Sequence, residues 1–216
     1  MSKSAVIDLE FCNIPYRKRK GKLTREIIQI GVVVMNEDYQ IIETYDRKVS
    51  PQYGFIDKDI NRLTGISKKD VCRALPIKEA LQELVAWLPE DVTIVSWSDN
   101  DERQIRRELE TKNIYIDGID AIFENWVDCQ KTFGEKMHTQ RCYKLSEALV
   151  AADIEFKDGA HDGLVDAYNT ALLFAKMERE PELVLNPYYQ RAVSGEESSC
   201  GYSIGNLFSG LDLAIA

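Results

Sequence analysis

Apolar residues follow two patterns along the chain. Short runs rich in valine and isoleucine are typical of buried strands, and stretches whose apolar residues recur every three or four positions are typical of helices. The runs predict strands at residues 4–10, 26–36, 39–49, 92–97 and 122–128. The helical spacing predicts helices at residues 56–63, 67–74, 76–88, 100–112, 129–137, 145–152 and 163–178. This order predicts an α/β fold with a mixed central sheet flanked by helices.

The pattern weakens after residue 179, where Glu-Pro-Glu and Asn-Pro-Tyr-Tyr interrupt it. We therefore expect one folded domain over residues 1–180 and a C-terminal tail over residues 181–216. The last segment, residues 201–216, is apolar enough to dock on the domain or on another subunit. Its role and the oligomeric state of the protein stay open.

The first apolar run carries two acids, Asp8 and Glu10. Residues two positions apart on a strand point to the same face. Two neighbouring carboxylates that leave water repel each other and lose hydration, at a cost of several kcal/mol per ion. A divalent cation offsets this cost, and Mg²⁺ is usually bound by one or two carboxylates with water and phosphate oxygens. The pair therefore indicates half of a phosphoryl-transfer site, although a strand with one solvated acidic face has the same pattern.

A second polar group precedes the last predicted helix. His161 lies in a turn between Gly159 and Gly163, and Asp166 follows in the early turns of the helix. Each residue alone has an ordinary structural interpretation, because a histidine there is often a satisfied structural residue and an acid complements the helix dipole. Together with the acids of the first strand, the His-x4-Asp spacing belongs to a longer pattern.

The middle part of that pattern lies where the strand at 92–97 turns into a helix. Asp99 and Asp101 both fall in this turn, at the carboxyl end of the strand, where α/β sheets bind ligands. The whole pattern resembles the DEDDh family of 3′-to-5′ exonucleases, of the RNase T and polymerase proofreading type. The Trp-Ser-Asp-Asn-Asp stretch is most similar to the branch that contains the histone-mRNA and enhanced-RNAi exonucleases and the sporulation inhibitor KapD. In that alignment Asp101 is the third acid, and Asp99 stays the alternative.

Two weaker matches extend the resemblance. Residues 25–34 look like the family's second strand, with Gln29 where many members carry glutamate, and residues 61–66 look like its Leu-Thr-Gly-Ile turn. The resemblance implies a ribonuclease-H-like fold. It also implies that the terminal-nucleotide pocket is lined by Phe11, Thr64 and Ile66. For these three residues ordinary core packing is the alternative.

The resemblance implies hydrolysis of the 3′-terminal phosphodiester of single-stranded RNA or DNA, with RNA or short oligonucleotides favoured, and release of nucleoside 5′-monophosphates. Asp8, Glu10 and Asp166 would hold one Mg²⁺ or Mn²⁺. Asp8 would bridge to a second ion, which Asp101 would steady directly or through water. His161 would take the proton from the attacking water, a role that suits an imidazole because free imidazole is mostly neutral at physiological pH.

The charge of the chain adds one local candidate for substrate binding. A net charge of −9 argues against broad, high-affinity binding of duplex nucleic acid, which draws on extended basic surfaces. The loop after the first strand is an exception, since it carries Arg17, Lys18, Arg19 and Lys20. This loop is either a solvated surface or a clamp on the phosphates of an incoming single strand.

Two functions of other classes remain open. A non-catalytic protein that binds single-stranded ends would use the same cleft, although it has no need for four acids and a histidine. A ribonuclease-H-type endonuclease would share the acids and the fold, but it requires a groove for duplex, which the acidic balance does not favour. The preference for RNA or DNA depends on pocket geometry around the 2′-hydroxyl, which a sequence does not reveal.

The sequence also predicts a compartment. No apolar run approaches the length of a membrane span, and the first residues lack the apolar segment of a signal peptide. The five cysteines are odd in number and scattered, which suits reduced thiols. We therefore expect a cytoplasmic protein that does not contact a membrane.

Overall fold

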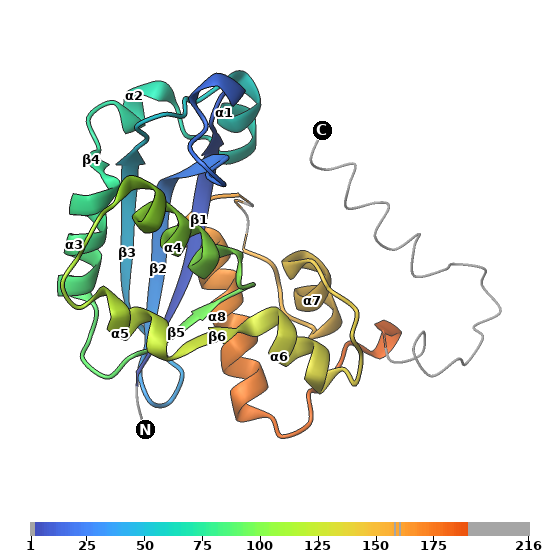
Figure 1. The fold of residues 1–216 in the computed structure, drawn as a ribbon. Coiled ribbons are helices and arrows are strands. Elements are labelled where there is room, and N and C mark those ends of the chain that lie inside the picture. The colour runs from blue at the N-terminus through green and yellow to red at the C-terminus, as the bar shows by residue number, and fades with distance from the viewer. Residues whose placement is uncertain (1–2, 158, 160, 190–216) are drawn as a thin grey trace.

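The computed structural model describes residues 3–157, 159 and 161–189, which form a mixed six-stranded sheet with helices on both faces (Figure 1). The strands are β1 (Ser4–Asn13), β2 (Arg25–Met35), β3 (Ile41–Ser50), β4 (Leu75–Pro76), β5 (Thr93–Ser96) and β6 (Trp126–Asp128). Their order across the sheet is β4-β3-β2-β1-β5-β6. β1, β2 and β3 pair antiparallel, whereas β4, β5 and β6 run parallel to their neighbours. The predicted α/β architecture is confirmed.

Most helices form two layers, one on each face of the sheet, and the two α-helices that precede β4 lie together at one end of it (Figure 1). The helices are α1 (Lys58–Thr64), α2 (Lys68–Val71), α3 (Ile77–Trp87), α4 (Asn100–Lys112), α5 (Ile119–Glu124), α6 (Cys129–Lys136), α7 (Leu145–Ala151) and α8 (Gly163–Arg179). Apolar residues of α3, α4 and α5 pack in one core with the sheet. Those of α6, α7 and α8 pack in a second core on the opposite face.

The alternation of side chains along β1 divides them between the two cores. Ile7 and Leu9 pack in the core under α3 and α4, whereas Val6 packs in the core under α8. Each of these side chains is at most 3% exposed. Full burial of such a side chain stabilises the fold by about 1.5–3 kcal/mol. Asp8 and Glu10 lie two and four positions after Val6 on the same strand. They therefore point to the same face as Val6, the face that α8 covers.

Two glycines allow α8 to begin directly on the sheet. A Cβ atom built on Gly31 of β2 would lie 2.2 Å from the carbonyl carbon of Gly163, the first residue of α8. A Cβ atom on Gly163 would lie 3.1 Å from the carbonyl oxygen of Asp8. At Gly31 only a residue without a side chain fits, whereas a side chain at Gly163 would require the backbone of Asp8 to shift slightly. The first turn of α8 therefore lies against β1 and β2, next to the two acids of β1.

The structure differs from the predicted elements in three places. The strand predicted at 122–128 is wrong in its first half, because Ile119, Ile122 and Phe123 have helical spacing and pack as part of α5. β1 continues to Asn13, with an irregularity in its pairing with β2 between Glu10 and Phe11. The acids therefore lie within β1 and not at its end. The two-residue β4 has no pattern of its own and was not predicted.

The segment after α8 folds back on the domain as far as it is described. The backbone N–H of Asn186 donates to the carbonyl of Ala151 at 2.8 Å, and the hydroxyls of Tyr189 and Tyr143 lie 3.1 Å apart. The predicted apolar segment at 201–216 lies outside the described residues. Among the helices that the structure describes, none is both long and apolar enough to cross a membrane.

Candidate active site

Four carboxylates from three elements converge on the α8 face of the sheet. Asp8 and Glu10 come from β1, Asp101 from the first turn of α4, and Asp166 from the first turn of α8. Burial raises the pKa of Asp8 well above its ordinary value, and the charges of Asp101, Asp166 and Glu10 raise it further. Burial, and after it the charges of Asp166, Asp101 and Asp162, raise the pKa of Glu10 to about 8. Carboxylates that are buried and repel one another are stabilised by a bound cation, so this cluster is a candidate metal site.

Asp101 reaches this cluster because β5 ends early. The parallel pairing of β1 with β5 stops at Val6 and Val95, so the backbone N–H of Leu9 has no strand partner on that edge. The N–H of Leu9 instead donates to Oδ1 of Asp101 at 3.2 Å. Burial raises the pKa of Asp101, although this hydrogen bond opposes the shift. Asp101 is 6% exposed, and its carboxylate is thus held beside the strand that carries Asp8 and Glu10.

Asp99 occupies a different environment in the same turn. It precedes α4 as the N-cap residue, its side chain is 38% exposed, and it forms an ion pair with Arg103 on the outer face of α4. A partly exposed carboxylate with its own cation is a poorer metal ligand than a buried one without a cation. This geometry supports Asp101 as the third acid, and the assignment stays a prediction.

A buried ion-pair network fixes α4 against β2. Nζ of Lys112 lies 2.6 Å from Oε1 of Glu26 and 2.6 Å from Oε2 of Glu108, and these side chains are 4% exposed or less. Glu108 also accepts a hydrogen bond from the backbone N–H of Ile27 at 2.6 Å. Breaking such a network leaves an uncompensated buried charge, which typically costs about 3–5 kcal/mol. The network therefore holds the C-terminal half of α4 against β2.

The turn before α8 places His161 and Asp166 together. Asp162 is the N-cap of α8, and its Oδ1 accepts hydrogen bonds from the backbone N–H groups of Leu164 and Val165. His161 has a left-handed backbone conformation with φ of 64°, which is uncommon for a residue with a side chain. Its backbone N–H donates to Oδ2 of Asp166 at 3.0 Å. Backbone strain of this kind is often found at functional sites.

The donor set fits a hard divalent cation. One ligand atom from each of Glu10, His161 and Asp166 lies within 4.8 Å of the others. Asp8 and Asp101 add further carboxylates beside this group: burial is the main cause of the raised pKa of Asp8, and the charges of Asp101, Asp166 and Glu10 raise it further. Oxygen donors of this kind suit Mg²⁺ and Mn²⁺. His161 is close enough to these carboxylates to serve as a ligand or as a base.

Without divalent cations, the protein is expected to become less stable as the pH rises from about 4.5 to about 8. In this range Glu10 keeps its proton in the folded protein, where its pKa is about 8, but loses it in the unfolded chain, where its ordinary value is 4.5. The folded state then binds more protons, so the free energy of unfolding decreases with pH. Thermal unfolding followed by circular dichroism, in EDTA and in Mn²⁺, tests this.

Mn²⁺ should raise the melting temperature more near pH 8 than near pH 5, because at the higher pH it replaces carboxylate repulsion. The matched control is Glu10→Gln, which removes this titration and should flatten the pH dependence in EDTA. A wild-type curve as flat as that of Glu10→Gln would show that the acids are not a destabilising cluster.

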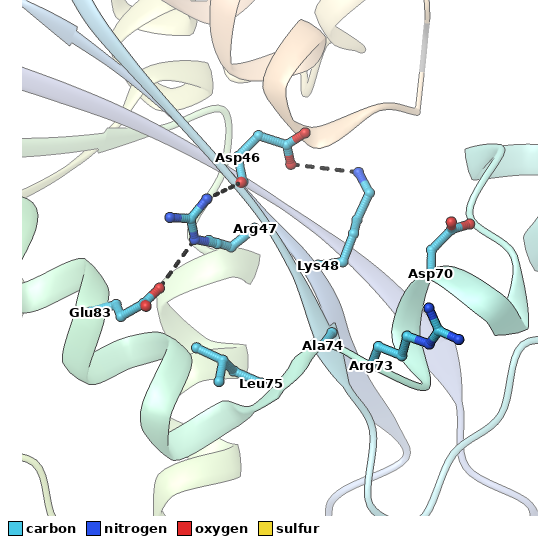
Figure 2. Close-up of a pocket in the computed structure, with 8 residues that line it drawn as sticks. All are labelled: Asp46, Arg47, Lys48, Asp70, Arg73, Ala74, Leu75 and Glu83. Atoms are coloured by element: carbon cyan, nitrogen blue, oxygen red, sulfur yellow. Dashed lines mark hydrogen bonds and ion pairs between the residues drawn. The ribbon is translucent and has the colours of Figure 1, made fainter.

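Lys48 is a cation next to the acid cluster. In the sheet, Glu10 pairs with Gln29 of β2, and Gln29 pairs with Lys48 of β3. Lys48 partly offsets the raised pKa of Glu10, for which burial is the main cause. Figure 2 shows Lys48 with its ammonium turned toward the carboxylate of Asp46, at 3.5 Å.

The pocket of Figure 2 lies at this edge of β3 and has a volume of about 480 Å³. It is lined by Asp46, Arg47, Lys48, Asp70, Arg73, Ala74, Leu75 and Glu83. Three acids and three cations balance each other there, and Arg47 is paired with Glu83 at 3.1 Å. It contains none of the predicted catalytic residues, so we do not assign it to the reaction.

The residues predicted to line the terminal-nucleotide pocket differ in exposure. Phe11 is partly buried, and the guanidinium of Arg25 lies 4.9 Å from its ring centre. Thr64 is 7% exposed, and its hydroxyl donates to the carbonyl of Ile60. Ile66 is 2% exposed and packs with Cys12 in a small core. Their substrate role stays a prediction, and core packing describes Ile66 in this structure.

The basic loop after β1 is ordered and exposed. Its backbone is held at one side by the pairing of Ile14 with Thr24, and Leu23 is completely buried beneath it. Arg19 turns back, with its Nε 3.2 Å from the carbonyl of Ile14. The side chains predicted to bind substrate, all of them exposed, are Arg17, Lys18, Arg19 and Lys20. A defined loop with outward cations is compatible with either a solvated surface or a phosphate contact.

The structure adds Asp162, Gln29 and Lys48 to the surroundings of the site. Of these, only Gln29 was named from the sequence, as a position where many family members carry glutamate, and it was given no role. Asp162 lies close enough to Asp8, Glu10 and Asp166 to raise the pKa of each, although burial is the main cause in each case. An Asp before a helical apolar run is a recognisable N-cap signal, so Asp162 could have been found. The nearness of Gln29 and Lys48 to Glu10 could not have been found from the sequence, because it follows from the register of the strands.

Comparison with known protein families gives one match over most of the chain. Residues 5–174 match the RNase T family model, whose description is exonuclease. ERI1 exoribonuclease 2 of Mus musculus is 28% identical over 204 residues, which cover 81% of this chain and 28% of that protein. The 3′-5′ exonuclease Snipper of Drosophila melanogaster is 26% identical over 198 residues, which cover 76% of this chain and 67% of that protein. The chain thus spans less than a third of the mouse relative's length.

Solved structures share the fold. The nuclease domain of 3′hExo, described as a DEDDh family member bound to rAMP, has a TM-score of 0.72 and 21% identity, and the match covers 86% of this chain and 96% of that one. Cell-death related nuclease 4 has a TM-score of 0.68 and 19% identity, over 86% of this chain and 67% of that one. The mixed sheet and its helices therefore have the ribonuclease-H-like fold that the sequence resemblance implied.

Proposed function

The chain belongs to the DEDDh exonuclease family, whose RNase T model it matches over residues 5–174, and from this premise we propose that it is a metal-dependent 3′-to-5′ exonuclease. Its substrate would be the 3′ end of single-stranded nucleic acid, and its products nucleoside 5′-monophosphates. The observation that carries the proposal is the convergence of the carboxylates of Asp8, Glu10 and Asp101 with His161 and Asp166 at the start of α8.

Each residue of this cluster would have a defined role. Asp8, Glu10 and Asp166 would hold one Mg²⁺ or Mn²⁺, and Asp8 and Asp101 would hold a second. Two bound ions would stabilise the attacking and leaving oxygens of an in-line displacement at the 3′-terminal phosphodiester. The hydrogen bond between the N–H of Leu9 and Asp101 keeps the Asp101 carboxylate in its orientation. Preorganised ligands of this kind supply much of the catalytic effect in phosphoryl transfer.

His161 would act as the general base. It would take the proton from the attacking water as the bond to phosphorus forms, while the 3′-oxygen of the preceding nucleotide leaves. The backbone N–H of His161 donates to Asp166, so the base and this carboxylate keep a fixed relative position. Geometry of this kind typically contributes about 10²- to 10⁴-fold to the rate.

RNA is the favoured substrate, since the relatives include proteins named exoribonucleases and a DEDDh structure bound to rAMP. Most of the mouse relative's length lies outside its match with this chain, so its full set of substrates does not carry over.

A single incubation separates the proposed activity from its alternatives. A 5′-labelled single strand, as RNA and as DNA, is incubated with Mg²⁺ or Mn²⁺ and resolved on a denaturing gel. A ladder that shortens by one nucleotide at a time is expected. Internal cuts would indicate a ribonuclease-H-type endonuclease, and an intact strand that the protein retards on a native gel would indicate a non-catalytic binder. An Asp8→Asn preparation, purified in parallel, excludes a contaminating nuclease.

The basic loop is expected to act on substrate capture and not on chemistry. Replacing Arg17, Lys18, Arg19 and Lys20 with serine should raise KM for oligonucleotides several bases long, while kcat stays within a few-fold. Each phosphate of the single strand that the loop no longer neutralises should reduce the slope of log K against log salt by about 0.7. Steady-state kinetics at several salt concentrations measure both quantities, and a raised KM with unchanged kcat indicates weaker uniform binding.

Dinucleotides should barely respond, since they lack distal phosphates. The control is Lys78→Ser with Lys131→Ser, which removes exposed cations from α3 and α6. If long substrates keep the wild-type KM and salt slope, or if the control has the same effect as the loop variant, the loop is an ordinary solvated surface.

A further inference from the structure

Gln29 is a buried amide next to the catalytic cluster for which the proposed mechanism has no role. It lies within β2, pairs with Glu10 of β1, and is completely buried. Its Nε2 donates to Oδ1 of Asp46 at 2.9 Å and to Oδ1 of Asp162 at 3.3 Å. Its Oε1 accepts a hydrogen bond from the backbone N–H of Gly163 at 3.3 Å. One side chain thus connects the sheet to the first residues of α8.

These contacts require an amide. Two of the partners are carboxylates, which only accept, and the third is a backbone N–H, which only donates. A glutamine satisfies all three at once. A glutamate of the same shape has no proton to donate when ionised and would face two further carboxylates. A neutral glutamine at position 29 is therefore compatible with the carboxylates of Asp46 and Asp162, whereas an ionised glutamate is not.

The contacts of Gln29 lie at the point where a small displacement would matter most. Gly163 touches β2 and β1 with no side chain between the backbones, as its contacts with Gly31 and Asp8 show. His161 is two residues before Gly163, and Asp166 is three residues after it. Any shift of the helix start therefore moves both residues relative to Glu10. A misplacement of about 1 Å can cost an enzyme about 10²-fold in rate.

Gln29 also affects Asp162, the additional acid near the cluster. Oδ1 of Asp162 receives the N–H groups of Leu164 and Val165 together with Nε2 of Gln29. Three donors on one oxygen hold this carboxylate at the helix start. Without the amide, Asp162 would have fewer partners and could turn toward the metal ligands.

We propose that Gln29 is a positioning residue of this enzyme: it fixes the start of α8, and with it His161 and Asp166, against the acids of β1. The inference rests on the proposed exonuclease function. It concerns the placement of α8, so it can also be measured through metal binding, without any hydrolysis.

The test compares Gln29→Glu, which keeps the shape but removes the two donors, with the double variant Gln29→Glu/Asp46→Asn. Position 46 lies in β3 and caps no helix, so its new amide can turn a donor toward the glutamate at position 29, where Oδ1 of Asp46 accepts from Gln29 in the wild type. Kinetics on a short oligonucleotide and calorimetric titration with Mn²⁺ provide two independent measurements. Gln29→Glu should lower kcat by about 10²-fold with KM within a few-fold, and should weaken Mn²⁺ binding by about 10-fold, since outer contacts typically change metal affinity by 10- to 100-fold. The double variant should recover part of both losses, because one of the two carboxylates that face position 29 is then neutral.

The matched control is Gln104→Glu, which also converts a buried glutamine into an acid. Gln104 is 1% exposed on α4, and its Nε2 donates to the carbonyl of Arg25 and to Oε1 of Glu108, away from α8. It should lower the melting temperature without the selective loss of kcat. If Gln29→Glu does not fold, Gln29→Met, which removes the hydrogen bonds without adding a charge, takes its place and should show the same direction of change.

Two results would overturn the inference: kcat and Mn²⁺ affinity of Gln29→Glu equal to those of Gln104→Glu, or a double variant no better than Gln29→Glu. Failure of the proposed function is distinguishable from both. In that case the wild type itself would not hydrolyse the strand, while the Mn²⁺ titrations of the variants would still report whether Gln29 positions α8.

Discussion

Replacing Asp8, Glu10, Asp101 or Asp166 with alanine is expected to lower kcat by at least about 10²- to 10³-fold, the usual cost of removing one preorganised electrostatic contact. Each carboxylate would act only as part of one metal cluster, so no remaining acid can substitute for the one removed. The fold should stay intact, because burial and mutual repulsion raise the pKa of Asp8 and Glu10 and make their charges destabilising without metal. Single-turnover kinetics and circular dichroism measure the two effects.

Asp99→Ala is the matched control for the third acid. Asp99 lies in the same turn as Asp101, but it is paired with Arg103 and partly exposed. This variant should keep near wild-type activity. If Asp99→Ala is inactive while Asp101→Ala is near wild type, the roles of the two residues are exchanged.

His161→Ala is expected to keep divalent-metal binding and lose about 10²- to 10⁴-fold in rate, the range of a positioned general base. The remaining activity should rise with pH, because hydroxide then replaces the missing base. Pre-steady-state kinetics across pH and a Mn²⁺ titration test both statements. A variant that loses Mn²⁺ affinity would show that His161 is a ligand, a role that its 4.8 Å grouping with Glu10 and Asp166 also permits.

His161→Gly separates the imidazole from the backbone. The left-handed conformation of His161, with φ of 64°, suits glycine without strain. The glycine and alanine variants should therefore lose the same activity, while the glycine variant should be the more stable. A difference in activity between them would mean that the conformation of the turn, and not only the imidazole, contributes to the rate.

Much of the fold could be predicted because it depends on residues that are close together in the sequence. Alternation along the first apolar run correctly places Asp8 and Glu10 on the face opposite Ile7 and Leu9. The same reasoning failed at residues 122–124, which were predicted as part of a strand. Ile122 and Phe123 belong with Ile119 to a helix, and only packing under the sheet decides between the two. Short apolar segments are ambiguous for this reason.

The candidate site was less predictable where it depends on contacts between distant elements. The carboxylates and the histidine stand out by residue type and spacing. The environment that distinguishes Asp101 from Asp99 depends on the free N–H of Leu9, which exists only because β5 stops pairing at Val6. Likewise, the role of Gln29 depends on the approach of Gly163 to Gly31, two residues separated by most of the chain.

The early end of β5 also limits how the chain can change in length. An insertion that extended β5 by one further pair along β1 would give the N–H of Leu9 a strand partner and displace the carboxylate of Asp101. A deletion in the turn between Ser96 and Asn100 would rotate α4 and move Asp101 away from β1. Homologous chains that keep the activity should therefore conserve the length of this turn more strictly than its residues, whereas loops at the opposite end of the sheet can vary in length.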